Sequence, residues 1–389
     1  MSAERYDVII AGAGPAGSTC ACACAKAGLR VLLLEGSTFP RPKPCGGILS
    51  ERALSHLGFS LPSDLIEREC FGVRVHYGKH TIEVRKEYRI AVMVNREMFD
   101  HFLARQAVLA GAVLHEGEPV RKVVVHRDRV EATTDVGQYE ARCLVGADGA
   151  NSVVGRMVRP MFGRDEIAAA LVGMFPMDDR EIDARLEGLL DLYFGVAPRG
   201  YGWVFPHKGY CAVGVLGQAA EFDAPQKAFS DFAASRGMAV ARPQGHTIPW
   251  GRSTRTVKGR RIILAGDAAG FADPFHGEGI ANAILSGNLA ARAMAEGIGQ
   301  GKKDPLTWYA AECDRLIMGE MRITFQMARM RERYPKLFLK LFFSDRIALD
   351  KYLDIAAGKS DYRQFRRWLL KKLPRTLLSM LVSRNIART

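Results

Sequence analysis

The chain has 389 residues, 48% of them hydrophobic and 25% charged, which is the composition of a globular protein large enough for two or three packed units. Its eight cysteines follow neither a disulfide ladder nor a zinc-binding spacing, so no metal site is expected. The sequence contains no apolar run of membrane-spanning length and no secretory leader, and we therefore expect a cytoplasmic protein without a transmembrane helix.

The first informative stretch is an apolar strand followed by a glycine-rich turn. Residues 8–10 form an unbroken apolar run, which is typical of a strand covered on both faces. Gly12, Gly14 and Gly17 follow in G-x-G-x-x-G order: the first permits a tight turn, the second lets backbone approach a pyrophosphate, and the third lets a helix pack on the strand. The pattern predicts a helix over residues 18–27 whose N-terminal N–H groups point at phosphates.

A second buried strand is predicted over residues 29–34, and it ends in Glu35, about 20 residues after the glycines. A carboxylate at this position can bind a ribose hydroxyl and disfavours a 2′-phosphate, so the expected nucleotide is FAD or NAD-like rather than NADP. The loop that follows is rich in proline and glycine. In it, Arg41 and Lys43 can meet phosphate or carboxylate groups, and Ser50 can cap a helix.

Elements of a second sheet come next. Residues 71–77 and 80–84 alternate in polarity and predict short strands. Arg96 opens a predicted helix whose apolar side chains are expected on one face. These side chains are Met98, Phe99, Phe102, Leu103 and Val108. Several further strands, interleaved with Gly and Pro between residues 168 and 217, predict an antiparallel sheet that carries the substrate.

Two later strands also run into glycine-and-acid turns. Residues 143–152 form an apolar strand that leads into a turn, and Asp148 is expected to fix that turn. Residues 262–265 form another buried strand that ends near Asp267, whose carboxylate suits a polyol chain. A helix is predicted to begin near Gly279 and Ile280, where partial positive charge collects.

Together these stretches resemble a known group of flavoproteins. GAGPAG with Glu35, VGADGANS at 145–152 and AGDAAGFADPFHGEGI at 265–280 resemble the three fingerprints of the FAD-dependent fold shared by aromatic hydroxylases, flavin halogenases and geranylgeranyl reductases. KPCGG at 43–47 and YGWVFP at 201–206 are most similar to the geranylgeranyl reductase family. The resemblance covers roughly the first 300 residues.

The resemblance implies a mixed α/β (α+β) chain with three parts. They are a Rossmann-like FAD-binding domain of residues 1–70, 91–165 and 255–300, an antiparallel-sheet substrate domain of residues 71–90 and 166–254, and a helical, basic C-terminal segment of residues 301–389. In the family, a G-x-G follows the YxWxFP motif, whereas this chain reads Gly214-Val215-Leu216-Gly217. If that stretch forms a turn that shapes the prenyl cavity, the cavity of this protein differs in width or length.

The resemblance also implies which residues hold FAD. The phosphates lie at the glycine turn, the adenosine ribose on the acid after the second strand, the ribityl chain on the acid of the third motif, and the ring beside the KPCGG loop and above the last helix N-terminus. The implied cofactor-binding residues are Gly12, Gly14, Ala16, Gly17, Glu35, Cys45, Gly46, Gly47, Arg96, Val120, Asp267, Gly279 and Ile280. A helix N-terminus aimed at the ring stabilises negative charge there by about 0.3–2 kcal/mol.

The implied activity is a reductase that saturates C=C bonds of a prenyl chain in an isoprenoid lipid or quinone, with hydride from flavin N5. The electron donor, NAD(P)H or ferredoxin, stays open because the chain has no second G-x-G-x-x-G unit. One alternative is an aromatic monooxygenase or halogenase, although YGWVFP lacks the first tryptophan of the halogenase W-x-W-x-I-P stretch. The other is a flavin electron carrier to membrane quinone.

Reduction of an alkene also requires a proton. Cys45, Tyr201 and ordered water are candidate donors, because an apolar pocket keeps a thiol or phenol neutral. For Cys45 the alternative is a small residue in a tight turn. Tyr201 and Trp203 are also expected to line the cavity, and with Cys45 they form the predicted catalytic set. His276 lies next to the proposed flavin edge and can shuttle protons, but it is not included in that set.

Most of the formal charge of +13 lies in the C-terminal segment. Residues 316–389 contain 17 Lys and Arg against 6 Asp and Glu, which is +11. At helical spacing, Phe365, Trp368, Leu369 and Leu373 can form one face, while basic residues, namely Arg366, Arg367, Lys371 and Lys372, point elsewhere. This pattern predicts reversible attachment to the inner membrane face, or alternatively a cap that packs on the flavin domain. No nucleic-acid module accompanies the charge.

Overall fold

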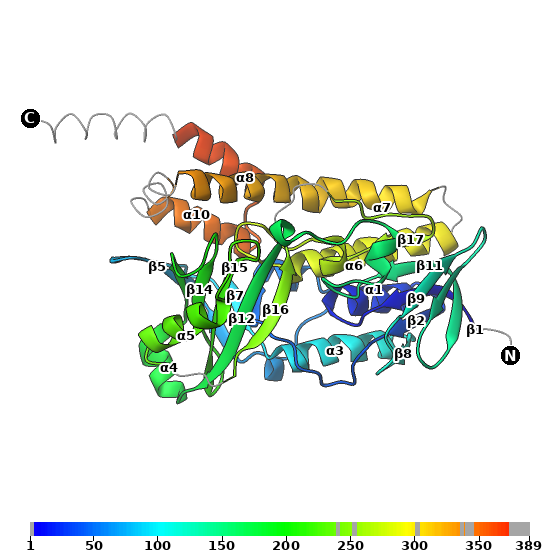
Figure 1. Cartoon of the computed structure of the whole chain (residues 1–389), viewed down its shortest axis with the longest axis horizontal. Helices are drawn as coiled ribbons and strands as arrows, with labels where there is room; N and C mark the ends of the chain where they lie inside the picture. The colour runs from blue at the N-terminus through cyan, green and yellow to red at the C-terminus, as the bar shows by residue number, and fades with distance from the viewer. Residues whose placement is uncertain are drawn as a thin grey trace, which may run out of the picture.

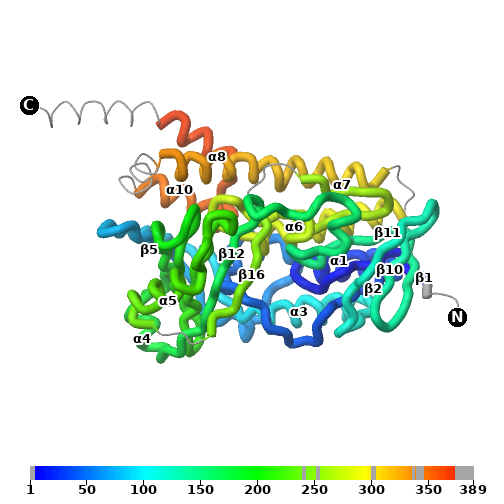
Figure 2. Tube along the Cα trace, viewed as in Figure 1, coloured from blue at the N-terminus to red at the C-terminus, as the bar shows by residue number. Residues whose placement is uncertain are grey.

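The structure is a computed structural model that describes residues 4–238, 242–250, 255–299, 304–334, 338 and 346–372. Within these ranges the chain forms two seven-stranded sheets and one three-stranded sheet. Figure 1 shows the strands of the second sheet at one end of an elongated molecule, with α7, α8 and α10 (Pro305–Cys313, Gly319–Arg333 and Arg346–Ala356) along one side. Figure 2 shows that the chain crosses from one large sheet to the other more than once.

The first sheet is mostly parallel at its centre. Its order is β8-β2-β1-β11-β10-β9, and β17 pairs with β11 off this path. The strands are β1 (Glu4–Ala11), β2 (Val31–Leu34), β8 (Val113–His115), β9 (Lys122–Val125), β10 (Val130–Thr133), β11 (Gln138–Gly146) and β17 (Ile262–Leu264). The apolar runs seen in the sequence are buried here because helices cover them.

Strand β11 divides one of its edges between two partners. Its first half pairs with β10 in antiparallel fashion, and residues 144–146 pair with β17 in parallel fashion. The other edge of β11 pairs with β1, and there Gly146 is in register with Ala11. On the divided edge, Gly146 is in register with Leu264 of β17. The three glycine-and-acid turns predicted from the sequence therefore leave the sheet side by side at the carboxyl ends of parallel strands, which is where α/β sheets bind ligands.

The second sheet has the order β16-β12-β15-β14-β13-β5-β6 and is antiparallel apart from the β13–β5 pair. Its strands are β5 (Gly72–Tyr77), β6 (His80–Arg85), β12 (Ile167–Pro176), β13 (Leu189–Phe194), β14 (Tyr201–Pro206), β15 (Tyr210–Gln218) and β16 (Gln244–Pro249). Two helices that the sequence did not predict, α4 (Asp179–Leu186) and α5 (Pro225–Ser235), pack on one face of this sheet. The opposite face is left for a cavity.

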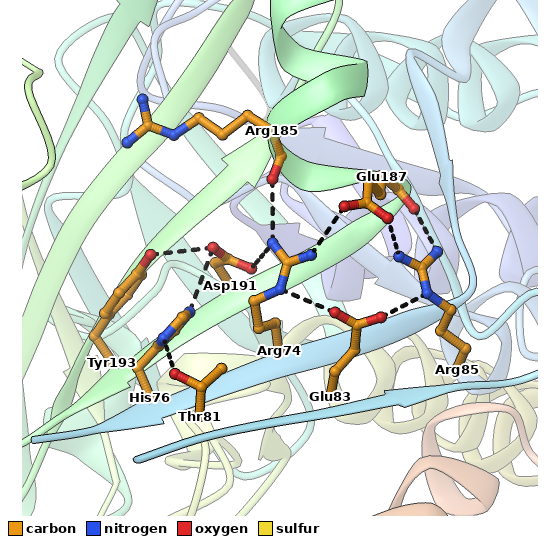
Figure 3. A network of polar contacts seen from close by, with 9 residues as sticks. All are labelled: Arg74, His76, Thr81, Glu83, Arg85, Arg185, Glu187, Asp191 and Tyr193. Carbon is orange, nitrogen blue, oxygen red and sulfur yellow. Dashed lines mark hydrogen bonds and ion pairs between the residues drawn. The ribbon is translucent and has the colours of Figure 1, made fainter. Parts of the chain in front are cut away.

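The parallel β5–β13 seam carries a polar network on the face away from that cavity (Figure 3). Arg74 contacts Glu83 at 3.1 Å and Asp191 at 3.5 Å, so one guanidinium links three strands. The ring of His76 stacks on Tyr193 with centroids 4.2 Å apart. Because side chains alternate along a strand, the residues between these polar ones face the other side, where they are apolar.

The third sheet and the remaining helices join the two large sheets. The third sheet has the order β3-β7-β4, with strands Ile48–Ser50, Ala91–Met93 and Arg68–Cys70. The helices are α1 (Pro15–Lys26), α2 (Glu51–Ser55), α3 (Arg96–Leu109) and α6 (Ile280–Met294), together with a 3₁₀ turn over Gly266–Ala269. As predicted, Ser50 caps α2, with its Oγ accepting from the N–H of Ala53 at 3.1 Å.

The prediction that five apolar side chains share one face of α3 was wrong in part. Met98 and Val108 are 48% and 38% exposed. The buried face of the helix contains Phe99 and Leu103 together with small alanines and a polar pair, Arg96 and Asp100. The polar pair is buried because its two charges are bonded to each other, a possibility that an apolar pattern does not reveal. Residues 214–217 likewise lie within strand β15 and do not form a turn.

The C-terminal segment is helical over α7, α8, α10 and residues 362–372. Phe365 and Leu369 are buried against α8 and α10, whereas Trp368 is half-buried and the basic residues 366, 367 and 371 are exposed. Leu373 lies outside the described residues. Phe275, from the range predicted as flavin domain, lies in the same buried cluster, and this agrees with the interpretation of the segment as a packed cap. None of the helices in the described ranges combines the length and apolarity needed to cross a membrane.

Candidate active site

The three turns line a cavity of about 480 Å³, called here the dinucleotide cavity. Its walls come from the ends of β1, β2, β11 and β17, from the loop after Glu35 and from the first turns of α3 and α6. Of the predicted cofactor residues, those that line it are Gly12, Gly14, Ala16, Glu35, Cys45, Arg96, Val120, Asp267, Gly279 and Ile280. The remaining three, Gly17, Gly46 and Gly47, do not line it.

The three glycines of the first turn have different surroundings. A β-carbon on Gly12, whose φ is +95°, would stand 2.4 Å from the carbonyl oxygen of Ala147, and one on Gly17 would stand 1.8 Å from the oxygen of Gly12. Beside Gly14 the nearest atom is 3.9 Å away, on Arg41. Gly12 and Gly17 therefore permit close packing, while Gly14 leaves open the space that a phosphate needs at the start of α1.

Glu35 holds the turn from the end of β2. Its carboxylate accepts from the N–H of Ala13 at 2.8 Å and from the N–H of Ser37 at 3.1 Å. Arg41 forms an ion pair with it at 3.3 Å and bridges to Asp100, also at 3.3 Å. Arg41 thus meets carboxylates, one of the two partners predicted for it, and Glu35 remains on the cavity wall with its position fixed.

Arg96 lines the cavity from the first turn of α3. Its guanidinium donates to Asp100 at 2.9 and 3.0 Å. Burial would lower the pKa of Arg96, but the Asp100 carboxylate outweighs burial and raises the pKa above its usual value. A permanently charged, rigidly held guanidinium at this wall can serve the anionic half of a dinucleotide.

Asp267 and Lys43 both line the dinucleotide cavity. Burial raises the pKa of Asp267, and the nearby cations Lys43 and Arg96 oppose that shift. Lys43 Nζ lies 3.3 Å from Nε2 of His246 on β16. Burial lowers the pKa of Lys43, and burial together with Lys43 lowers the pKa of His246 to about 3, so this imidazole is neutral at physiological pH. No sequence motif indicated a role for His246.

A second cavity, of about 280 Å³, opens from the first and is called here the apolar cavity. The inner face of the second sheet forms one wall through Val73, Val75, Val172, Leu190, Leu192, Phe194, Tyr201, Trp203, Phe205 and Leu216. Residues from the C-terminal segment form another, namely Phe338, Leu349, Tyr352, Leu353, Ile355, Ala356 and Tyr362. The two cavities share Pro44, Cys45, His246, Ile248, Gly277, Gly279 and Ile280. Gly46 and Gly47 line the apolar cavity only.

The residues of the predicted catalytic set all reach the apolar cavity. Cys45 stands at its junction with the dinucleotide cavity, and its Sγ accepts from the N–H of Gly47 at 3.5 Å. The hydroxyl of Tyr201 donates to the backbone oxygen of His276 at 2.5 Å. Trp203 is buried, and its Nε1 has no hydrogen-bond partner among the described residues. The Tyr201 hydroxyl is thus engaged in a hydrogen bond, whereas the Trp203 N–H is buried without one among the described residues.

The contribution of the C-terminal segment to this cavity was not predicted from the sequence. Tyr352 and Tyr362 lie opposite the second sheet, and the Tyr362 hydroxyl is 3.3 Å from Nε2 of His276. The only available signal was the presence of apolar and aromatic residues at helical spacing in a basic segment, which also fits a membrane-surface helix. Asp148, as predicted, fixes its turn by accepting from the N–H groups of Val153 and Val154 at 2.7 and 3.1 Å.

These features fit FAD. Open space lies beside Gly14 at the N-terminus of α1, the fixed carboxylate of Glu35 suits a ribose hydroxyl, and the buried acid Asp267 suits a polyol chain. At the junction, α6 begins at Ile280 with Gly279 as its N-cap, and no side chain caps its first N–H groups. These groups are therefore available to the far end of a bound dinucleotide.

Comparisons with known proteins agree with this geometry. The family model described as FAD binding domain matches residues 5–184. The chain is 31% identical over 348 residues to the geranylgeranyl diphosphate reductase of Rhodobacter capsulatus, and the matched region covers 84% of each protein. It is 30% identical over 379 residues to the digeranylgeranylglycerophospholipid reductase of Thermoplasma acidophilum, covering 91% of this chain and 92% of the relative.

The fold is also that of a solved structure. The crystal structure of a geranylgeranyl bacteriochlorophyll reductase-like protein from Thermoplasma acidophilum superposes with a TM-score of 0.79 at 24% identity, covering 97% of this chain and 99% of the other. The architecture is therefore shared along almost the whole length of both proteins. Together with the two sequence relatives, this shows that the chain belongs to the geranylgeranyl reductase family of FAD-dependent oxidoreductases.

Proposed function

We propose that this protein saturates carbon–carbon double bonds of a prenyl chain carried by an isoprenoid lipid or quinone. The observation that supports this most directly is the junction of the two cavities: a long apolar surface ends at residues that also line the dinucleotide cavity. An unfunctionalised hydrocarbon chain offers no polar group for recognition, so shape and apolar area must hold it. The names of the two sequence relatives refer to geranylgeranyl compounds, which agrees with such a substrate.

The side chains of the apolar cavity suit a polyene. Aromatic rings of Phe194, Trp203 and Phe205 lie along the sheet wall, with Trp203 and Phe205 stacked at a centroid distance of 6.0 Å. Aromatic faces offer large apolar contact areas to double bonds. FAD, when bound and reduced, supplies hydride to a substrate carbon. The protein itself excludes water from this surface and holds the double bond near the junction at Cys45 and Gly279.

Two other functions of this fold have less support. Halogenases use a lysine beside the substrate, and no lysine is found among the described residues that line the apolar cavity. An aromatic monooxygenase binds a compact substrate, whereas this cavity extends from the junction to Phe338 and Tyr352. A flavin electron carrier would need no enclosed apolar chamber beside its cofactor.

A single-turnover experiment tests the proposal. The FAD-loaded enzyme is reduced by light without oxygen and mixed with geranylgeranyl diphosphate or with a digeranylgeranylglycerophospholipid, and the products are examined by mass spectrometry. We expect mass increments of two hydrogens per bond reduced. If the reduced flavin is reoxidised by a quinone but never by an alkene, the protein is an electron carrier instead. A product that gains oxygen in air would establish the monooxygenase, and one that gains halogen would establish the halogenase.

We propose further that the C-terminal segment brings the enzyme to the surface of an anionic membrane. Arg366, Arg367 and Lys371 are exposed on the outer side of the last described helix, and Leu370 beside them is 59% exposed. Each basic residue near an anionic surface contributes about 1 kcal/mol. The helix remains packed through its buried face, so both roles are compatible. The electron donor is NAD(P)H or ferredoxin.

A further inference from the structure

A cluster of ionisable side chains lies where the two cavities meet. His276 precedes α6, and its ring is held between two carboxylates: Nδ1 is 2.7 Å from Asp273 Oδ1, and Nε2 is 3.3 Å from Glu278 Oε2. Nε2 is also 3.3 Å from the hydroxyl of Tyr362. His276, Glu278 and Tyr362 all line the apolar cavity, so Nε2 is the ring nitrogen directed toward it.

The surroundings of the ring favour its charged form. Burial by itself would lower the pKa of His276, but the carboxylates of Asp273 and Glu278 outweigh it and raise the pKa to about 10. Burial would raise the pKa of Glu278, but its hydrogen bond and charge interaction with His276 lower it to about 2. The imidazole therefore carries a proton on each nitrogen at physiological pH.

The elements packed against this cluster preserve its charges. From α2, Arg52 forms an ion pair with Glu320 of α8 at 2.7 Å and also lowers the pKa of Glu278. Ser50, at the end of β3, donates its hydroxyl proton to Glu278. Tyr352 of α10 stands edge-on to the imidazole with centroids 5.9 Å apart, and Arg331 of α8 donates to the backbone oxygen of the preceding Phe275. Of the charged groups around His276, the carboxylates of Asp273 and Glu278 are the ones that stabilise the cation.

The tyrosine hydroxyls beside the cavity are less suitable proton donors. The Tyr201 hydroxyl donates to a backbone oxygen, and burial raises its pKa above the ordinary value for tyrosine. Burial likewise raises the pKa of Tyr352 and of Tyr362. These phenols keep their protons more tightly than free tyrosine does. His276 is 28% exposed at its side chain, and the apolar cavity is the space that its ring borders.

We propose that His276 is the catalytic acid of this site and that Asp273, Glu278 and Tyr362 are its positioning residues. The inference rests on the function proposed above. In the step, the π electrons of the double bond form a C–H bond with the Nε2 proton, the Nε2–H bond breaks, and the imidazolium becomes a neutral imidazole. The other carbon accepts hydride supplied by the reduced cofactor, so one saturated bond results from one hydride and one proton. Solvent returns the proton to the imidazole between turnovers.

The first test is a titration that does not depend on activity. The FAD-loaded protein is labelled with ¹⁵N at its nine histidines, and the ring nitrogens are followed by NMR from pH 5 to 11. We expect one imidazole to stay charged until about pH 10, and that signal to be absent in His276→Gln. If no imidazole stays charged well above the ordinary histidine pKa, the proposal is wrong.

The second test is the single-turnover reduction of the prenyl substrate. His276→Gln should slow it about 10²–10⁴-fold, the usual contribution of a general acid, with FAD content and melting temperature kept. His80→Asn, which changes an exposed histidine at the start of β6, is the matched control and should match wild type. A wild-type rate in His276→Gln would overturn the inference while leaving the proposed function intact. Failure of wild type to reduce any alkene would remove both.

Asp273→Asn provides a second variant that retains the imidazole. With one carboxylate lost, the rate should begin to fall at a lower pH than in wild type, because the charged imidazole is less stabilised. If the high-pH limb of the rate profile stays where it is in wild type, His276 is not the acid. This outcome is independent of whether His276→Gln folds.

Discussion

Gly214 lies directly against the indole of Trp203: a β-carbon at position 214 would stand only 2.1 Å from Cζ2 of the ring. Gly214, the first glycine of the 214–217 stretch, is therefore a packing residue in strand β15. Gly214→Ala must push the indole toward the apolar cavity, which we expect to cost about 1–3 kcal/mol in the free energy of unfolding, as overpacking does.

The same change should shorten the cavity, so turnover of long prenyl chains falls more than turnover of short ones. Gly245→Ala, on strand β16, is the matched control because the nearest atom to its new β-carbon is 3.6 Å away. Thermal melting and single-turnover rates with geranyl and geranylgeranyl substrates measure both effects. Equal behaviour of the two variants would mean that the indole position does not limit the cavity.

The carboxylate of Glu35 should be needed to hold FAD. Glu35→Gln replaces a charged acceptor that holds Ala13 N–H and Ser37 N–H, and hydrogen bonds to charged groups are worth about 1.5–3 kcal/mol. We therefore expect FAD to bind about 10–100-fold more weakly in a fluorescence titration of the FAD-free protein. Glu116→Gln, at an exposed acid that accepts from Phe39 N–H, should bind FAD as wild type does.

Asp267 should destabilise the FAD-free protein at neutral pH. Its pKa is raised in the folded state, so the folded protein holds the proton more tightly than the unfolded chain does, and stability falls as the pH rises above the unfolded value of 3.8. Asp267→Asn removes this loss. In urea unfolding, the variant should be more stable than wild type at pH 7 and similar to it at pH 3.5. A destabilised variant at pH 7 would show that Lys43 and Arg96 already offset burial.

His276 should make the opposite kind of contribution to stability. Because its folded pKa of about 10 lies above the unfolded value of 6.5, its stabilising effect is complete below pH 6.5 and disappears as the pH rises through about 10. The difference in unfolding free energy between wild type and His276→Gln should accordingly be large at pH 6 and small at pH 10.5. A difference that does not vary with pH would contradict a charged imidazole in the fold.

Membrane attachment can be tested by reversing the charge of the outer helical face. The triple variant Arg366→Glu, Arg367→Glu, Lys371→Glu should lose co-sedimentation with anionic liposomes at low salt, whereas wild type should bind. A second triple variant with exposed charges reversed on the flavin domain, at Arg5, Arg105 and Lys122, controls for net charge. Equal binding of both variants would show that the attraction is not specific to the C-terminal helix.

The nucleotide half of the site was predictable from sequence because its determinants are local. The glycine turn, the acid that ends β2 and the start of α6 near Gly279 each lie within a short stretch whose residue types dictate the backbone. The roles of those residues toward FAD remain predictions. The register that brings Ala11, Gly146 and Leu264 together also follows from parallel strands meeting at one edge.

The substrate half was predicted less well because its determinants are contacts between distant segments. His276 and Tyr362 are 86 residues apart, and Lys43 and His246 are 203 apart. No periodicity within one segment signals such a meeting. The buried ion pair on α3 also escaped prediction, because a pattern based on apolarity assigns charged residues to the surface.

Residues of the C-terminal segment form one wall of the apolar cavity. Within the described ranges, every residue that borders the dinucleotide cavity precedes position 284. The C-terminal wall of the apolar cavity and the walls of the dinucleotide cavity are therefore encoded in different stretches of the chain. A chimera that exchanges residues 346–372 with those of a relative would change which tails are accommodated while preserving the yellow colour of the holoprotein.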